Sequence, residues 1–235
     1  KIPYNGILRW QGKQRRGQIH YKNKKFYLYQ SVEVPDVKKK HSAVSAGMDL
    51  GIKRLIAIHT SEGNDLLIGG KRHYKQWSHY GDLIAKEQSY LATIRRKTSK
   101  KLSRLYDRRR VWQNTLYNNL VSKAFRFLRR NNVSHLYVGD VRGIRKDADT
   151  GTEANKMLHN YWAYDRKYHK LANKAEEYGI EYVPITEEYT SQQCPCCGDI
   201  DQQNKKDRIF VCGFCEYFGH RDIVGAENIM CKGMR

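Results

Sequence analysis

Two cysteine pairs near the end of the chain, CPCCG (194–198) and CGFC (212–215), are followed closely by HRDIVGAENI (220–229). Two residues lie inside each pair, and 14 residues separate Cys197 from Cys212. This spacing is typical of two tight turns that each present two sulfurs, about 2.3 Å from one Zn²⁺, with the stretch between them folding back as a short hairpin. Because all four ligands are thiolates, the predicted zinc is structural. The ligands are Cys194, Cys197, Cys212 and Cys215.

Two disulfides are the alternative explanation of this pattern. They would require an oxidising compartment, whereas the chain is rich in lysine and opens without an apolar signal segment, so we expect zinc. Cys196 and Cys231 fall outside the paired spacing and are predicted to take no part in the site.

The composition points to a polyanionic partner. The 235 residues include 44 Lys and Arg against 24 Asp and Glu, a net charge of +20 that is spread along the chain. Contacts to a phosphate backbone release counterions, so such a chain gains affinity for nucleic acid without reading sequence. A generally basic protein without such a partner is the alternative. No apolar run approaches the roughly 18 residues that a membrane span needs, so we expect no membrane partner.

Hydrophobic periodicity predicts strands, then helices, then alternating strands and helices. Alternating runs in 1–35, such as GILRW and KKFYLYQSVEV, favour short antiparallel strands, and this early strand pattern without an initiator Met suggests that the chain starts inside a longer protein. Further strands are predicted at 44–50, 55–60, 65–68, 135–141 and 180–185, and helices at 71–130 (an antiparallel pair), 160–178 and 225–234.

The helical pair carries a run of cations without a compensating block of acids. A solvated helix face could explain such a run, but we favour contact with a nucleic-acid backbone because the like charges repel one another. The predicted contacts are Arg95, Arg96, Lys97, Lys100, Lys101, Arg104 and Arg108.

Two aspartates are candidate site residues by their context. Asp49 ends a predicted strand among apolar neighbours, where an unpaired carboxylate is costly and a bound metal would relieve that cost. Asp222 follows the second cysteine pair and precedes Gly225 and Ala226, small residues that let a helix pack closely on a sheet.

Four stretches of the chain resemble blocks of the TnpB (OrfB) family of transposon-encoded RNA-guided DNA nucleases. They are AGMDLGIKRLIAIHTSEG, LYVGDVRGI, NKAEEYGIEYVPITEEYTSQQCPCCG and FGHRDIVGAENI, within about 45–230. The resemblance implies an α/β fold of the RNase H-like (RuvC) type, a mixed five-stranded sheet with flanking helices, an inserted four-cysteine zinc ribbon and a short N-terminal β segment. It assigns 1–40 to part of a wedge domain, 41–190 and 219–235 to the nuclease domain, 71–130 to a helical pair within it, and 191–218 to the ribbon.

The resemblance also implies catalytic Mg²⁺ held by acids from distant segments. Asp49 matches the first acid of the family and Asp222 the third, but the position of the usual glutamate holds Gly139. Glu187, just before the ribbon, is our predicted second acid, because the resemblance extends to family members that carry their glutamate there. Asp140 is the alternative, although alternation along the strand would point it away from the site.

The implied function is RNA-guided cleavage of DNA by a TnpB-like protein, with DNA and a guide RNA as partners and a cytoplasmic, nucleoid-associated location. Two other classes stay open. One is an inactive, transposon-derived nucleic-acid-binding protein that has lost an acid; the other is a transposase that acts without RNA.

Overall fold

The computed structural model describes residues 5–6, 12–22, 24–140, 164–200 and 208–235. The chain divides into two units, Lys1–Lys38 and Lys39–Arg235. Among the described residues, no helix combines the length and the apolar character that crossing a membrane would require.

The first unit contains an antiparallel hairpin of β1 (Lys13–Lys22) and β2 (Lys25–Glu33). Its rings pair across the strands, as in Tyr21 against Phe26 with centroids 4.8 Å apart. These two rings are nevertheless 65% and 75% exposed, because a two-stranded ribbon has no second layer to cover them. The expected strands in 12–35 are confirmed; GILRW lies mainly outside the described residues.

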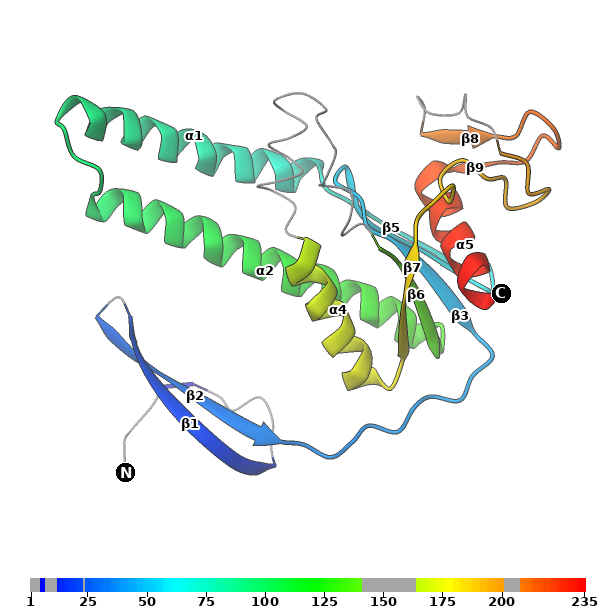
Figure 1. Cartoon of the computed structure of the whole chain (residues 1–235), viewed down its shortest axis with the longest axis horizontal. Helices are drawn as coiled ribbons and strands as arrows, with labels where there is room; N and C mark the ends of the chain where they lie inside the picture. Colours follow the sequence, from blue (N-terminus) through cyan, green and yellow to red (C-terminus); the bar gives the residue numbers. More distant parts are fainter. Residues whose placement is uncertain (1–4, 7–11, 23, 141–163, 201–207) are drawn as a thin grey trace. The chain divides into compact units, whose positions relative to one another are not determined.

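The second unit is built on a mixed five-stranded sheet, as the sequence predicted (Figure 1). Its order is β5 (Asp65–Gly69), β4 (Arg54–Thr60), β3 (Ser45–Asp49), β6 (His135–Asp140) and β7 (Glu181–Thr186). The first three strands form an antiparallel meander, and β6 and β7 run parallel to β3. The carboxyl ends of β3, β6 and β7 therefore lie at one edge of the sheet.

Helices cover both faces of this sheet (Figure 1). On one face lie α2 (Lys100–Arg130) and α4 (Tyr164–Tyr178), and α5 (Arg221–Met234) lies on the other. The main core joins sheet residues such as Met48 and Leu136 to Phe125 of α2 and Leu171 of α4. The buried positions of α2 recur at helical spacing, which explains why the periodicity of the sequence located this helix: Leu116, Tyr117, Leu120, Val121, Ala124, Phe125 and Leu128.

The helix α5 approaches the sheet very closely at β3. A Cβ at Gly47 would collide with the carbonyl oxygen of Ala226, so only glycine fits at that point of the strand. This helix begins at Arg221 rather than at residue 225 as predicted. The reason is the cap: Nδ1 of His220 accepts a hydrogen bond from the N–H of Asp222 at 3.3 Å, so the first turn starts at the histidine.

The helix α1 (Lys71–Thr93) pairs with α2 as predicted. Its buried Glu87 accepts a hydrogen bond from Ser99 Oγ at 2.8 Å and forms an ion pair with Lys101 Nζ at 2.6 Å. Ser99 in turn caps α2 by accepting from the N–H of Leu102 at 2.9 Å. This network fixes the turn between the two helices.

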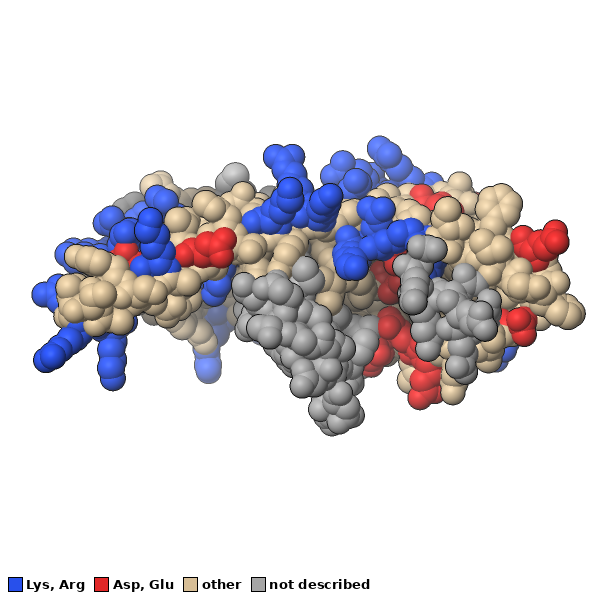
Figure 2. Space-filling view, turned by 90° about the horizontal axis from the view of Figure 1, so that it is seen from above, with Lys and Arg blue, Asp and Glu red and all other residues tan. Residues whose placement is uncertain are grey.

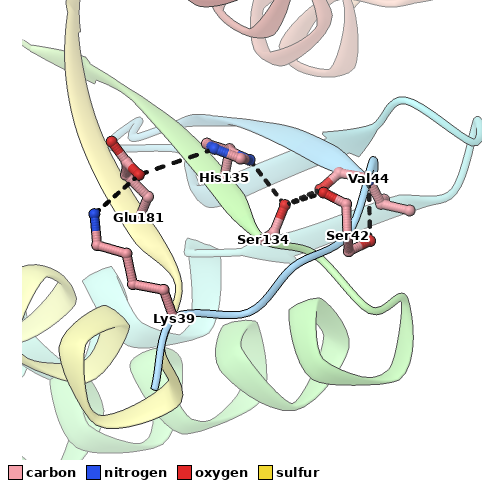
Figure 3. A network of polar contacts seen from close by, with 6 residues as sticks. All are labelled: Lys39, Ser42, Val44, Ser134, His135 and Glu181. Atoms are coloured by element: carbon pink, nitrogen blue, oxygen red, sulfur yellow. Dashed lines mark hydrogen bonds and ion pairs between the residues drawn. The ribbon is translucent and has the colours of Figure 1, made fainter. Parts of the chain in front are cut away.

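A polar network ties the segment before β3 to the opening ends of β6 and β7 (Figure 3). Ser134 Oγ lies 2.8 Å from His135 Nδ1, and His135 Nε2 lies 3.9 Å from Glu181. Ser134 is 1% exposed, and its hydroxyl donates to the carbonyl oxygens of Ser42 and Val44. Because the hydroxyl is buried and bound to the backbone, Ser134, His135 and Glu181 hold the chain in place and do not form a catalytic triad. Glu181 also accepts from Lys39 Nζ at 3.3 Å.

Candidate functional site

The four cysteines predicted as metal ligands come together in one cluster. Their sulfurs all lie within 4.8 Å of one another, and the Cys194–Cys215 and Cys197–Cys212 pairs are both 3.6 Å apart. Sulfurs about 2.3 Å from a tetrahedral ion lie about 3.8 Å from each other, whereas a disulfide bond is about 2.05 Å long. The donor set therefore fits zinc, and Cys196 and Cys231 lie outside the cluster.

Each cysteine pair forms the same backbone turn. The N–H of Gly198 donates to the carbonyl of Cys194 at 2.9 Å, and the N–H of Glu216 donates to that of Cys212 at 3.2 Å. Both donors have a positive φ, +79° for Gly198 and +59° for Glu216. Backbone N–H groups of Cys215 and Phe214 lower the pKa of the Cys212 thiol to about 7, which favours the thiolate that binds metal.

The described ribbon contains the antiparallel strands β8 (Ile209–Val211) and β9 (Phe218–His220), which flank the second turn. The hairpin predicted between the two cysteine pairs falls partly on 201–207, which lie outside the described residues. Phe210 is fully buried with Cys194, Cys212 and Val224 of α5, so the ribbon is packed onto the helix that carries Asp222.

The structure brings Asp49 and Asp222 to the same edge of the sheet. Asp49 ends β3, and Asp222 lies in the first turn of α5. Gly225 lies three positions after Asp222, so the two residues share a face of α5. A Cβ at Gly225 would lie 3.3 Å from Oδ2 of Asp49, so this helix face is next to the Asp49 carboxylate. The small residue at 225 thus makes room for the carboxylate of β3.

The Asp49 carboxyl is held in an unfavourable environment for its charge. Burial, followed by the neighbouring Asp222 carboxylate, raises its pKa from 3.8 to about 7. A hydrogen bond from the N–H of Leu50 and the nearby Arg221 only partly oppose this shift.

Glu187, directly after β7, reaches into the same region. Burial, then Asp49 and then Asp140, raise the pKa of Glu187 from 4.5 to about 8. Its Oε1 is buried without a hydrogen-bond partner among the described residues. The carboxylates of Asp49 on β3 and Asp140 on β6 therefore act on Glu187, and Asp222 acts on Asp49 from α5.

Gly139 on β6 explains how Glu187 fits. A Cβ at residue 139 would collide with Oε1 of Glu187, so the carboxylate of residue 187 fills the space where a side chain of residue 139 would begin. The carbonyl of Gly139 accepts a hydrogen bond from Tyr168 of α4, which holds the end of β6 in place.

Asp222 has a partner that sequence reasoning missed. Arg208 Nη1 donates to its Oδ2 at 3.0 Å. Arg208 lies directly before β8, and its carbonyl accepts from the N–H of Arg221 at 2.9 Å. No spacing rule in the sequence connects residues 208 and 222.

The carboxylates are more widely spaced than the thiolates. Within the described ranges, the four cysteines are the only group of three or more His, Cys, Asp or Glu side chains whose ligand atoms lie close enough together to hold one metal ion. Oxygen ligands nevertheless suit Mg²⁺. Among the described residues, Oε1 of Glu187 has no hydrogen-bond partner, and the charge of Arg221 offsets only part of the rise in the pKa of Asp49.

The cations predicted to contact nucleic acid surround the turn between α1 and α2. All seven are exposed, from Arg95 to Arg108, although Lys101 is paired with Glu87. Figure 2 shows Lys and Arg side chains over much of the face seen from above.

Together, the sheet order, the helices on its two faces and the cysteine ribbon define a protein with a Cas12f-like fold. A family model described as probable transposase (OrfB_IS605) matches residues 29–145, and one described as Cas12f1-like, TNB domain matches residues 164–229. The first match contains Asp49, and the second contains Glu187, the four cysteines and Asp222. The chain belongs to the family of TnpB/OrfB and Cas12f1-like proteins.

Curated relatives support this assignment. The TnpB-like protein ORF457 of Acidianus two-tailed virus is 26% identical over 263 residues, which cover 100% of this chain and 56% of that protein. The CRISPR-associated endodeoxyribonuclease Cas12f1 of Syntrophomonas palmitatica is 25% identical over 203 residues, which cover 80% of this chain and 38% of that protein. The chain thus spans only about half the length, or less, of these relatives.

Two solved structures share the fold. One is a cryo-EM structure of a Cas12f1-sgRNA-target DNA complex, with a TM-score of 0.63 and 18% identity over 90% of this chain and 55% of that one. The other, a CRISPR-Cas12f ternary complex, also has a TM-score of 0.63, with 19% identity over 91% of this chain and 44% of that one.

Proposed function

We propose that this chain is the catalytic portion of a TnpB-like, RNA-guided endonuclease that hydrolyses DNA phosphodiester bonds. The observation that carries the proposal is the convergence of Asp49, Glu187 and Asp222, which come from two strand ends and the start of a helix. The pKa of Asp49 is raised to about 7 and that of Glu187 to about 8. Acids kept together against their mutual repulsion are typical of a functional site.

Asp49, Glu187 and Asp222 are the residues that would hold Mg²⁺. Bound Mg²⁺ would supply Lewis-acid activation of a water and stabilisation of the leaving oxygen of the phosphodiester. The protein itself positions the three carboxylates. The absence of a side chain at Gly225 leaves space for Asp49, and the absence of one at Gly139 leaves space for Glu187. The cap formed by His220 fixes the helical turn that carries Asp222.

Glu187 is the proposed second acid, with Asp140 as the alternative. The side-chain space at position 139, where family members usually place the glutamate, is occupied by the carboxylate of residue 187. The carboxylate of Glu187 thus lies beside position 139, although residue 187 follows the neighbouring strand.

The ribbon is proposed to hold a structural zinc, because four thiolates leave no open position for water. Its packing against Val224 links the ribbon to the helix of Asp222. DNA and a guide RNA are the proposed partners. The +20 charge, the exposed cations from Arg95 to Arg108 and the RNA and DNA of the similar Cas12f1 complex support them.

The decisive experiment is cleavage of single-stranded DNA by the intact chain with Mg²⁺. We expect cleavage that requires the divalent ion and is abolished by Asp49→Ala and by Asp222→Ala, with Asp82→Ala on the exposed side of α1 as a matched control. No cleavage with any guide would favour the inactive nucleic-acid-binding alternative. A defined RNA that co-purifies with the protein would count against a transposase that acts without RNA.

A second experiment separates the two candidates for the second acid. We expect Glu187→Gln to remove cleavage and Asp140→Asn to leave most of it. The double variant Gly139→Glu/Glu187→Gly should regain part of the activity, because it returns one carboxylate to the same space from β6. Loss of activity in Asp140→Asn with full activity in Glu187→Gln would reverse the assignment.

A further inference from the structure

A cationic groove of about 530 Å³ adjoins the carboxylate cluster. It lies between the loop that follows Asp49 and the N-terminal turn of α1, and Arg208, which lines it, also donates to Asp222. Five of the eight lining residues are Lys or Arg and none is acidic. The five are Lys53, Arg54, Lys71, Lys75 and Arg208.

The groove also has an apolar wall. Ile52 and Tyr74 line it, and the aliphatic stems of its long cationic side chains can add to that surface. The ring of Tyr74 stacks on Trp77, with centroids 6.0 Å apart and an interplanar angle of 24°. Because Trp77 is only 3% exposed, the tyrosine ring rests on a fixed support. A cavity of this size with a flat ring and charged groups suits one nucleotide.

The start of α1 reinforces the preference for an anion. Gly70 provides no side-chain cap, the first turn carries no acid, and the helix is 23 residues long. Its first N–H groups and its dipole therefore favour a negative charge at this end. The N–H of Gly70 donates to the carbonyl of Lys53 at 2.9 Å, which holds the loop cations beside the helix. Within the described structure, Nε of Arg54 is buried without a hydrogen-bond partner.

We propose that this groove binds one nucleotide of the DNA strand that is cut, with its phosphate among Lys53, Lys71 and Arg208 and its base or sugar on Tyr74. The proposal rests on the proposed nuclease function, because the link through Arg208 to Asp222 places the groove beside the carboxylates. The groove would thereby fix which phosphodiester bond of the strand lies at Asp49 and Asp222.

The first test measures binding of a fluorescent single-stranded DNA in EDTA over a range of salt concentrations. We expect Lys53→Gln/Lys71→Gln to reduce the slope of log K against log[salt] by about 0.7, since the proposal places one phosphate between these lysines and each phosphate neutralised on a single strand contributes about 0.7. The matched control is Lys86→Gln/Lys123→Gln, two exposed lysines outside the groove, which should leave the slope unchanged. An equal fall in both double variants would overturn the proposal, because it would show only diffuse charge.

The second test uses a strand that carries 5-iododeoxyuridine. After irradiation we expect the cross-link on the peptide that contains Tyr74, and a more than fivefold loss of it in Lys53→Gln/Lys71→Gln. Tyr74→Phe should keep the binding affinity and Tyr74→Ala should weaken it. The proposal would be overturned if the cross-link formed only on other peptides. It would also be overturned if the variants weakened the binding of an RNA strand but not of a DNA strand.

These outcomes are independent of cleavage. If the strand binds in the groove but the chain does not cut it with Mg²⁺, the nuclease proposal fails and the groove stands only as a site that binds a DNA strand. If the chain cuts DNA and the groove variants bind and cross-link as wild type does, the groove proposal fails and the nuclease stands.

Discussion

The thiolate cluster and the carboxylate cluster of this protein are assembled in opposite ways. The four thiolates come from two similar turns that span 194–215, and each turn places its own pair. The carboxylates come from β3, β7 and α5, over 49–222, and repel one another. Local backbone geometry builds the first site, whereas the second exists only because the whole sheet and α5 hold it together.

The largest expected effect concerns the thiolates. Cys212→Ser should lose the metal and loosen residues 190–220, because zinc contributes about 10–16 kcal/mol to the folding of small zinc modules. Metal analysis and limited proteolysis would measure both changes. Cys196→Ser, exposed and outside the cluster, is the matched control and should keep one zinc per chain. A melting profile that does not change after chelation would contradict a structural metal.

A smaller effect is expected at the carboxylates. The pKa of Asp49 is raised in the folded protein, so its stabilising contribution is fully present below about pH 4 and is lost as the pH rises through about 7. In EDTA, the free energy of unfolding should therefore fall between pH 4 and pH 8, by up to about 4 kcal/mol at about 1.4 kcal/mol per pKa unit. Urea unfolding would measure this fall.

The variant Asp49→Asn tests the cause of that pH dependence. It should flatten the fall and be more stable than wild type at pH 8 in EDTA, because it removes the charge that the site cannot compensate. Asp82→Asn, at an exposed position of α1, should behave as wild type. The same fall in Asp49→Asn as in wild type would mean that other groups control the pH dependence.

The smallest effect distinguishes the two cysteine turns. Glu216 occupies, at φ +59°, the position that Gly198 occupies in the first turn. A left-handed conformation costs a non-glycine residue about 1–2 kcal/mol, and the greater flexibility of glycine offsets part of this. Glu216→Gly should therefore gain about 0.5–1 kcal/mol and retain zinc about two- to fivefold better in chelator competition. Weaker retention would show that the Glu216 side chain contributes to the turn.

The contrast between the clusters also explains what the sequence could predict. The cysteine site follows from spacing alone, and the strands and the long helices follow from periodicity, as in the buried series of α2. Asp49 and Asp222 were selected by their context and by family resemblance, since no local rule joins residues so far apart. The choice between Glu187 and Asp140 stays a prediction.

Other features could not be predicted because they depend on tertiary contacts. Arg208 meets Asp222 only after the ribbon has folded onto α5. Glu87 resembles any exposed helical acid in the sequence, yet it is 5% exposed and fixes the turn between α1 and α2. The start of α5 was placed too late because histidine is not among the residues expected as a helix cap.

The close approach of residues 139 and 187 has a consequence for where an acid can lie at this sheet edge. In the conformation described, the carboxylate of Glu187 lies where a side chain on residue 139 would begin, and no backbone atom lies as close. A side chain at residue 139 would therefore require only that the flexible Glu187 side chain turn aside. The backbone of this sheet edge would accept an acid at either position, but an acid at residue 139 would change where the carboxylate of Glu187 lies.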